Sequence, residues 1–282
     1  MTRQAYYKHS KNQFKEQVNN DLIITMVKKV REKQKRIGAR KLREIISKQL
    51  PEEMLIGRDA FFNLLRHYGL LVRRRKTRVI TTNSFHWLHK YPNRIRDLDP
   101  IRPNQLWVSD ITYIKVGEKF VYLFLITDAY SRKIIGWNLA ESMAAENALI
   151  ALYMALSQLP ASNKELTHHS DRGFQYCSTK YVNCLEKHGI KISMTENSDP
   201  YENAIAERVN GILKTEWLYD LDLNNYEEAK NAICKIIEIY NNERPHSSIE
   251  MLTPAEAHLK EGKLMRLWKS YTRQRHMELV ES

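Results

Sequence analysis

The chain has three cysteines in 282 residues and no long hydrophobic run. Cys177, Cys184 and Cys234 form an odd, scattered set that fits neither a disulfide framework nor a zinc pattern. A membrane span needs roughly 18 unbroken apolar residues, whereas the apolar run at 120–127 is far shorter and is typical of a buried strand. The charged N-terminus is followed by no apolar segment, so we expect no signal peptide. These absences predict a cytoplasmic protein with no membrane partner.

Acidic residues are scarce in the first third of the chain. Residues 1–100 hold 24 Lys+Arg against 9 Asp+Glu, a net charge of +15, whereas residues 101–282 hold 21 against 24, a net of −3; together these give the +12 of the whole chain. Such an asymmetry favours a nucleic-acid partner, because phosphates neutralised by Lys and Arg release counterions. A merely soluble basic protein is the alternative on charge alone.

Residues 1–80 are predicted to form an all-α, basic domain. Apolar residues recur at helical spacing in 21–34, 39–50 and 58–69, and Pro51 ends the second pattern. Three short helices with tight turns indicate a helix-turn-helix-like DNA-binding unit; a generic helical bundle with a solvated basic face is the alternative. The expected phosphate contacts are basic residues on the second helix and in the run that follows the third: Arg40, Lys41, Arg73, Arg74 and Arg75.

A linker at 81–103 is expected to lead to a second domain over 104–262, followed by a basic tail at 263–282. Three β-rich segments separated by short turns, at 105–116, 119–131 and 132–140, predict antiparallel strands joined by hairpins. Helical and strand patterns then alternate, with strands at 165–171 and 190–194 and helices at 144–159, 178–189, 200–217 and 226–243. This order predicts an α/β domain with a mixed five-stranded sheet and flanking helices.

Three acidic residues stand out by position in this second domain. Asp110 interrupts an apolar strand, where a buried charge needs a partner or a metal unless it faces outward. Asp171 ends a strand, and ligands of α/β sheets gather beyond the carboxyl ends of strands; an ordinary turn aspartate is the alternative. Glu207 lies on the predicted helix over 200–217, in a polar stripe with Asn203, Asn210 and Lys214, where a solvated helix face is the alternative.

The spacing of these acids and the sequence segments around them resemble a known family of proteins. Sixty residues separate Asp110 from Asp171, and 35 separate Asp171 from Glu207. The segments "WVSDITYI", "HSDRGFQY", "PYENAIAERVNGILKTEW" and "YNNERPHSSIEMLTPAEA" follow in order, after the helical "IGARKLREII". In these features the chain resembles the DDE transposases and retroviral integrases. It is most similar to the second-frame catalytic subunit of bacterial insertion-sequence transposases, over roughly residues 1–260.

The resemblance implies a ribonuclease-H-like core in which Asp110, Asp171 and Glu207 bind two divalent ions, Mg²⁺ or Mn²⁺. Asp110 would bridge the two ions, with Asp171 and Glu207 each serving one. Oxygen ligands of this kind suit those metals, and two such ions suit in-line attack at phosphorus. The implied activity is cleavage of DNA strands at insertion-sequence ends and their transfer to a target.

Further DNA contacts are expected at Lys214, which lies seven residues after Glu207 where the family has a basic residue, and at Asn203 and His169. The alternatives are that Lys214 is simply solvated and that His169 packs under its loop. The implied partners are the element's terminal inverted repeats, target DNA, the first-frame product (often as a fusion) and further copies on DNA, in association with the bacterial nucleoid. Two other functions stay open: a ribonuclease-H-like nuclease that cuts without joining, and a catalytically silent DNA-binding regulator.

Overall fold

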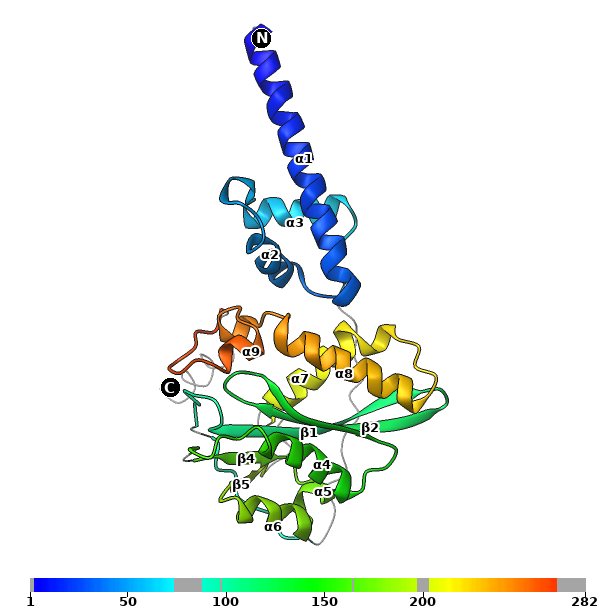
Figure 1. Cartoon of the computed structure of the whole chain (residues 1–282), viewed down its shortest axis with the longest axis vertical. Coiled ribbons are helices and arrows are strands. Elements are labelled where there is room, and N and C mark those ends of the chain that lie inside the picture. Colours follow the sequence, from blue (N-terminus) through cyan, green and yellow to red (C-terminus); the bar gives the residue numbers. More distant parts are fainter. Residues whose placement is uncertain (1–2, 74–87, 97, 164, 197–202, 268–282) are drawn as a thin grey trace, which may run out of the picture. The chain divides into compact units, whose positions relative to one another are not determined.

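The computed structural model describes residues 3–73, 88–96, 98–163, 165–196 and 203–267 (Figure 1). The chain folds as two compact units. The first comprises Met1–Thr77 and Thr215–Trp217, and the second comprises Arg78–Lys214 and Leu218–Ser282. Within the described residues, no helix is both long and apolar enough to cross a membrane.

The first unit contains α1 (Arg3–Lys33), α2 (Ala39–Ser47) and α3 (Arg58–His67), with a 3-10 turn η1 (Glu52–Met54) between the last two. The predicted helical character of this region is thus confirmed. Its core is formed by apolar side chains from the three helices and from the connection between α1 and α2: Ile23, Ile24, Val27, Ile37, Leu42, Ile46, Phe61 and Leu65. Arg40 and Arg73 are exposed, whereas Arg74 and Arg75 lie outside the described residues. Lys41 is half-buried, with its ammonium nitrogen 3.9 Å from a carboxylate oxygen of Glu216 in the same unit.

Helix α1 begins much earlier than the predicted start at residue 21. Its first two-thirds carry exposed aromatic side chains, Tyr7 and Phe14 among them. Only from Ile23 onward do apolar side chains recur on a face that packs against other helices. Hydrophobic periodicity reports burial, so it gave no signal for the exposed turns of this helix.

The second unit is built on a mixed five-stranded sheet of order β3-β2-β1-β4-β5. Strands β1 (Leu106–Val116), β2 (Lys119–Asp128) and β3 (Ile134–Ala140) are antiparallel, whereas β4 (Thr167–Ser170) and β5 (Lys191–Met194) run parallel to β1. Helices α4 (Ala145–Leu156), α5 (Phe174–Cys177) and α6 (Thr179–Lys187) cover one face (Figure 1). Helices α7 (Ala204–Glu216) and α8 (Tyr226–Asn242) cover the other, followed by α9 (Pro254–Ala257). The predicted five-stranded α/β fold is confirmed.

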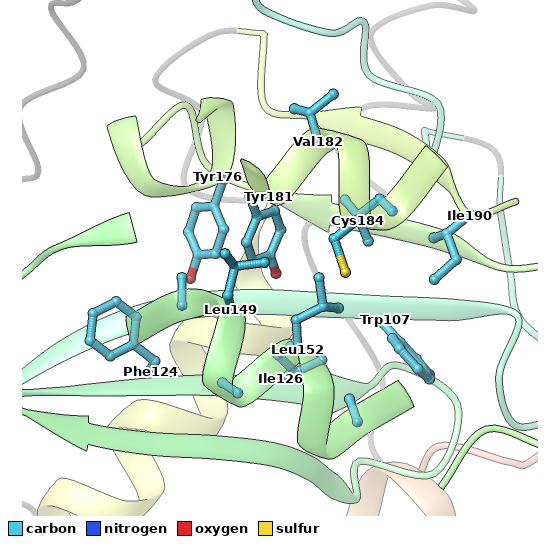
Figure 2. Packing of buried hydrophobic residues seen from close by; sticks show 14 of the residues in the cluster. Trp107, Phe124, Ile126, Leu149, Leu152, Tyr176, Tyr181, Val182, Cys184 and Ile190 are labelled. Atoms are coloured by element: carbon cyan, nitrogen blue, oxygen red, sulfur yellow. The ribbon is translucent and has the colours of Figure 1, made fainter. Parts of the chain in front are cut away.

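Strand β1 separates two apolar clusters because successive side chains of a strand point to opposite faces. Trp107 joins the larger cluster beneath α4, α5 and α6, where Figure 2 shows Tyr176 and Tyr181 reaching toward the sheet. Leu106 and Val108 join a smaller cluster with Ala206 of α7. Continuing this alternation by two residues directs Asp110 to the same face as Val108, the face covered by α7.

Helix α4 packs closely on β3 because Gly136 has no side chain. A Cβ atom placed there would lie 2.2 Å from the backbone oxygen of Ala151, a distance that no rotamer change can relieve. The backbone of α4 therefore approaches the sheet to a distance that only glycine permits.

We expect Gly136→Ala to destabilise the chain by roughly 1–3 kcal/mol, because the added methyl group must push α4 away from β3. Chemical denaturation followed by circular dichroism would measure it. Gly211→Ala is the matched control: a Cβ there meets no atom within 4 Å, and we expect unchanged or slightly raised stability. Equal effects of the two substitutions would contradict the close packing.

Candidate active site

The parallel register of β1 and β4 brings Asp110 and Asp171 together. Val108 pairs with His169 in this register. Two residues further along each chain, Asp110 lies level with Asp171, the first residue after β4. Neighbouring strands are about 4.8 Å apart, and residues in register project from the same face. Two carboxylates separated by 60 residues in sequence thus become neighbours at one strand end.

Asp110 is held by two hydrogen bonds. Its Oδ1 accepts from the backbone N–H of Ile111 at 2.9 Å, and its Oδ2 accepts from Nδ2 of Asn210 at 2.7 Å. Burial raises the pKa of Asp110 to about 7, and the charges of Asp171 and Glu207 raise it too, whereas the two hydrogen bonds lower it. Without a cation, the environment therefore disfavours the charged form of this carboxylate.

Asp171 lies in a tight turn that depends on Gly173. The backbone N–H of Gly173 donates to Oδ1 of Asp171 at 3.0 Å, and a Cβ atom at Gly173 would lie 2.9 Å from that same oxygen. Any larger residue would therefore crowd the carboxylate. Burial is the main cause of the raised pKa values of Asp110, Glu207 and Cys177. The negative charge of Asp171 is the second cause in each case.

Glu207 approaches the two aspartates from the first turn of α7. Its side chain is exposed, and its pKa is raised by partial burial and then by Asp171. In the described part of the chain, no three His, Cys, Asp or Glu side chains gather closely enough to hold one ion in common. Like charges repel at short range, so three ionised carboxylates have a physical reason to stand apart until a cation joins them.

The donor set fits Mg²⁺ or Mn²⁺. Both ions prefer oxygen ligands, and the carboxylates of Asp110, Asp171 and Glu207 supply only oxygen. Their mutual effect on pKa is that of a concentrated negative charge, which a divalent cation would neutralise. Deprotonation of Asp110 near neutral pH would then be favoured by the ion itself.

The other predicted site residues lie at different depths. Asn203 is buried, and its Nδ2 donates to the backbone oxygen of Ser109 at 3.1 Å. His169 is fully buried, with Nδ1 2.8 Å from Oγ of Ser193, so direct contact with DNA would require the ring to leave this position. Lys214 is half-buried; burial lowers its pKa and the nearby charge of Asp110 opposes that shift.

Asn210 is the site residue to which the sequence assigned no role. It lies in the polar stripe of Asn203, Glu207 and Lys214, yet it is buried against β1 instead of facing solvent. Its position one turn after Glu207 was the available signal. The sequence pattern could not predict the orientation of α7, which turns part of the polar stripe toward Asp110.

Comparisons with known proteins show the family to which the chain belongs. Two models described as "Integrase core domain" match residues 100–200 and 188–254. A 31 kDa protein of insertion element IS600 from Shigella sonnei is 39% identical over 205 residues, covering 72% of this chain and 75% of that protein. The transposase of insertion sequence IS629 from the same organism is 33% identical, covering 77% and 72% respectively. The chain belongs to the insertion-sequence transposases. Its integrase-type core is thus the DNA transposition module that the resemblance predicted.

A solved structure supports the fold of this transposase. A chain of the simian T-cell lymphotropic virus intasome, whose structure was determined in complex with the PP2A regulatory subunit B56 gamma, aligns with a TM-score of 0.51 at 18% identity. The alignment covers 83% of this chain and 77% of that one. At this identity the likeness concerns the arrangement of strands and helices.

We expect the stability of the metal-free protein to fall as pH rises from about 4 to beyond 7. The folded-state pKa of Asp110, about 7, lies above its ordinary value of 3.8, so the native state binds the proton more tightly than the unfolded state does. This contribution is complete below pH 4 and is lost as pH rises through 7. Denaturation of the wild type and of Asp110→Asn across this range would measure it, since the variant lacks the titrating group. Identical pH dependence in the two proteins would contradict the raised pKa.

We expect Asn210→Ala to raise the pKa of Asp110 further, because it removes a hydrogen bond to the charged carboxylate. NMR titration of the Asp110 carboxyl carbon in metal-free protein would detect the change. Asn231→Ala is the control, since Asn231 is exposed on α8 and has the same chemistry. An unchanged Asp110 titration in Asn210→Ala would show that this bond does not tune the carboxylate.

Proposed function

We propose that this transposase cleaves DNA strands at the ends of an insertion sequence and joins them to target DNA, using two divalent ions bound by Asp110, Asp171 and Glu207. The observation that carries the proposal is the β1–β4 register, which sets Asp110 level with Asp171, while Glu207 is near enough to perturb the titration of Asp110. A pair of carboxylates at the end of β4, with a third on the facing helix α7, fits a site for phosphoryl transfer.

The reaction needs an attacking oxygen, a leaving oxygen and relief of charge at phosphorus. In cleavage, water forms a new bond to phosphorus while the bond to the 3′ oxygen breaks and releases a 3′-hydroxyl. In joining, that 3′-hydroxyl attacks a target phosphate and displaces another 3′ oxygen. Bound Mg²⁺ or Mn²⁺ would supply activation of the attacking oxygen and stabilisation of the leaving one. Both steps use the same carboxylates because only the attacking oxygen differs.

The protein's own groups have separate tasks in this scheme. Asn210 fixes the orientation of Asp110 through Oδ2, and Asn203 fastens the start of α7 to β1 beside it. Lys214, partly buried and within reach of the field of Asp110, is suited to hold a DNA phosphate near the carboxylates. The helical unit would bind other phosphates of the DNA through its basic residues Arg40, Lys41 and the run beginning at Arg73.

The same proposal includes partners. Terminal inverted repeats and target DNA are the substrates, further copies of the chain would assemble on them, and the first-frame product would contribute recognition of the ends. A nuclease without joining activity and a silent DNA-binding regulator are distinguished from this transposase by their products: nicked strands alone in the first case, and no metal-dependent product in the second.

We expect Asp110→Ala, Asp171→Ala and Glu207→Ala each to abolish strand joining while leaving DNA binding largely intact, because each removes a metal ligand and no phosphate contact. A joining assay with labelled end oligonucleotides and Mg²⁺, run beside a binding assay, measures both. Asp222→Ala is the matched control, since Asp222 is exposed and outside the site. Full joining activity in Asp171→Ala would refute the assignment.

A further inference from the structure

A cavity of about 530 Å³ lies next to the carboxylates, where several distant segments of the second unit converge. Its walls come from the residues before β1, the start of β1, the turn between β2 and β3, the start of α7, Ser248–Ile249 and the segment 263–266. Much of the lining is apolar, with Leu106, Val108, Ile205 and Ile249 among it. Size and lining are those of a site for a small organic group. The proposed reaction has assigned no role to this cavity.

The cavity lies beside the candidate active site, with which it shares strand β1 and the start of α7. Val108 lines it, and Asp110 lies two residues further along β1 on the same face. Asn203 also lines it, one helical turn before Glu207. A group seated in the cavity is therefore adjacent to the reacting phosphate in the proposed reaction.

Asn203, which lines the cavity, carries a buried acceptor. Its side chain is only 6% exposed, and Nδ2 is engaged with the backbone oxygen of Ser109. Its Oδ1, by contrast, is buried and accepts no hydrogen bond from any described residue. A buried acceptor without a donor is costly, so this oxygen calls for a ligand that donates an N–H or O–H.

The rim of the cavity is cationic. Arg132, Lys263 and Arg266 line it, against one acidic residue, Asp99, whose carboxylate is 3.9 Å from Arg266. Arg132 donates to the backbone oxygen of Ala129 and, at 3.4 Å, to Oγ of Ser248. Burial lowers the pKa of Arg132 to about 10, and the neighbouring charge of Arg266 lowers it too. Cations that disfavour one another across a cavity are suited to an anion between them.

We propose that this cavity receives one nucleotide of the DNA strand, the one that flanks the scissile phosphate. The base lies on the apolar floor and donates an N–H to Oδ1 of Asn203, and its phosphate meets the cations of the rim. This inference rests on the proposed function and names a subsite for its substrate. It also gives a role to the segment "YNNERPHSSIEMLTPAEA", because Ser248 and Ile249 of that segment form part of the wall.

The test uses the whole protein, without divalent metal, and duplexes of the element's end carrying 2-aminopurine at single positions. Removal of a base from the stack raises 2-aminopurine fluorescence, and unstacking is the cost of seating it in a pocket. We expect a several-fold rise at the position flanking the cleavage site and little change at positions further inside. Leu264→Trp, which fills the cavity from a partly exposed segment, is expected to abolish that rise. No position-specific rise in the wild type, or an undiminished rise in Leu264→Trp, would overturn the proposal.

The cationic rim is tested by the salt dependence of binding to the same duplex. We expect Lys263→Ala and Arg266→Ala each to weaken binding and to reduce the slope of log affinity against log salt by about one. Lys235→Ala, an exposed lysine of α8 outside the cavity lining, removes the same charge and serves as control. An equal change of slope in Lys235→Ala would show that any surface cation has this effect, and would overturn the specific role of the rim. Wild-type joining without a fluorescence response refutes only the pocket, whereas the absence of joining refutes the proposed function.

Discussion

The parallel pairing of β1 with β4 is the constraint on which the site depends. A shift of one residue in that register would turn one carboxylate to the opposite face, because side chains alternate along a strand. The register is fixed on both sides of the sheet. On one face Trp107 packs beneath α4 to α6, and on the other Leu106 and Val108 pack against α7. The hydrophobic core therefore specifies the position of Asp110 relative to Asp171. The free energy gained by this packing offsets the cost of bringing two negative charges together.

Helix α7 completes the arrangement through two asparagines placed two turns apart. Asn203 binds the backbone oxygen of Ser109, and Asn210 binds the carboxylate of the next residue, Asp110. An amide is suited to this task because it donates a hydrogen bond without adding charge to a site that is proposed to bind a cation. A lysine in place of Asn210 would neutralise Asp110 and compete with the proposed metal. The two neutral amides thus keep α7 close to β1 without adding positive charge.

The sequence predicted those elements whose apolar side chains pack against another surface, and it missed those that do not. The strands and helices of the core were predicted because their apolar residues face packed surfaces, as Leu149 and Leu152 of α4 do. The outer turns of α1, where Tyr7 and Phe14 are exposed, have no such surface and gave no signal. The three acids were found through spacing and resemblance, but their geometry was not, because it depends on strand register and helix orientation. Asn210 shows the limit most clearly: a polar residue on a polar stripe is expected in solvent, and only the docking of α7 buries it.

Positive and negative charge are unevenly distributed along the chain, and this distribution bears on how DNA would bind. The site concentrates negative charge, since Asp171 and Glu207 add to the effect of burial in raising the pKa of Asp110, and it would repel a DNA phosphate. Approach of the substrate therefore needs positive charge from elsewhere in the protein. The chain holds this charge in its first hundred residues, which carry a net +15, and in Lys214, which lies within the field of Asp110. In the proposed reaction, this separation of the two signs of charge assigns the acids to the metal and the cations to the DNA.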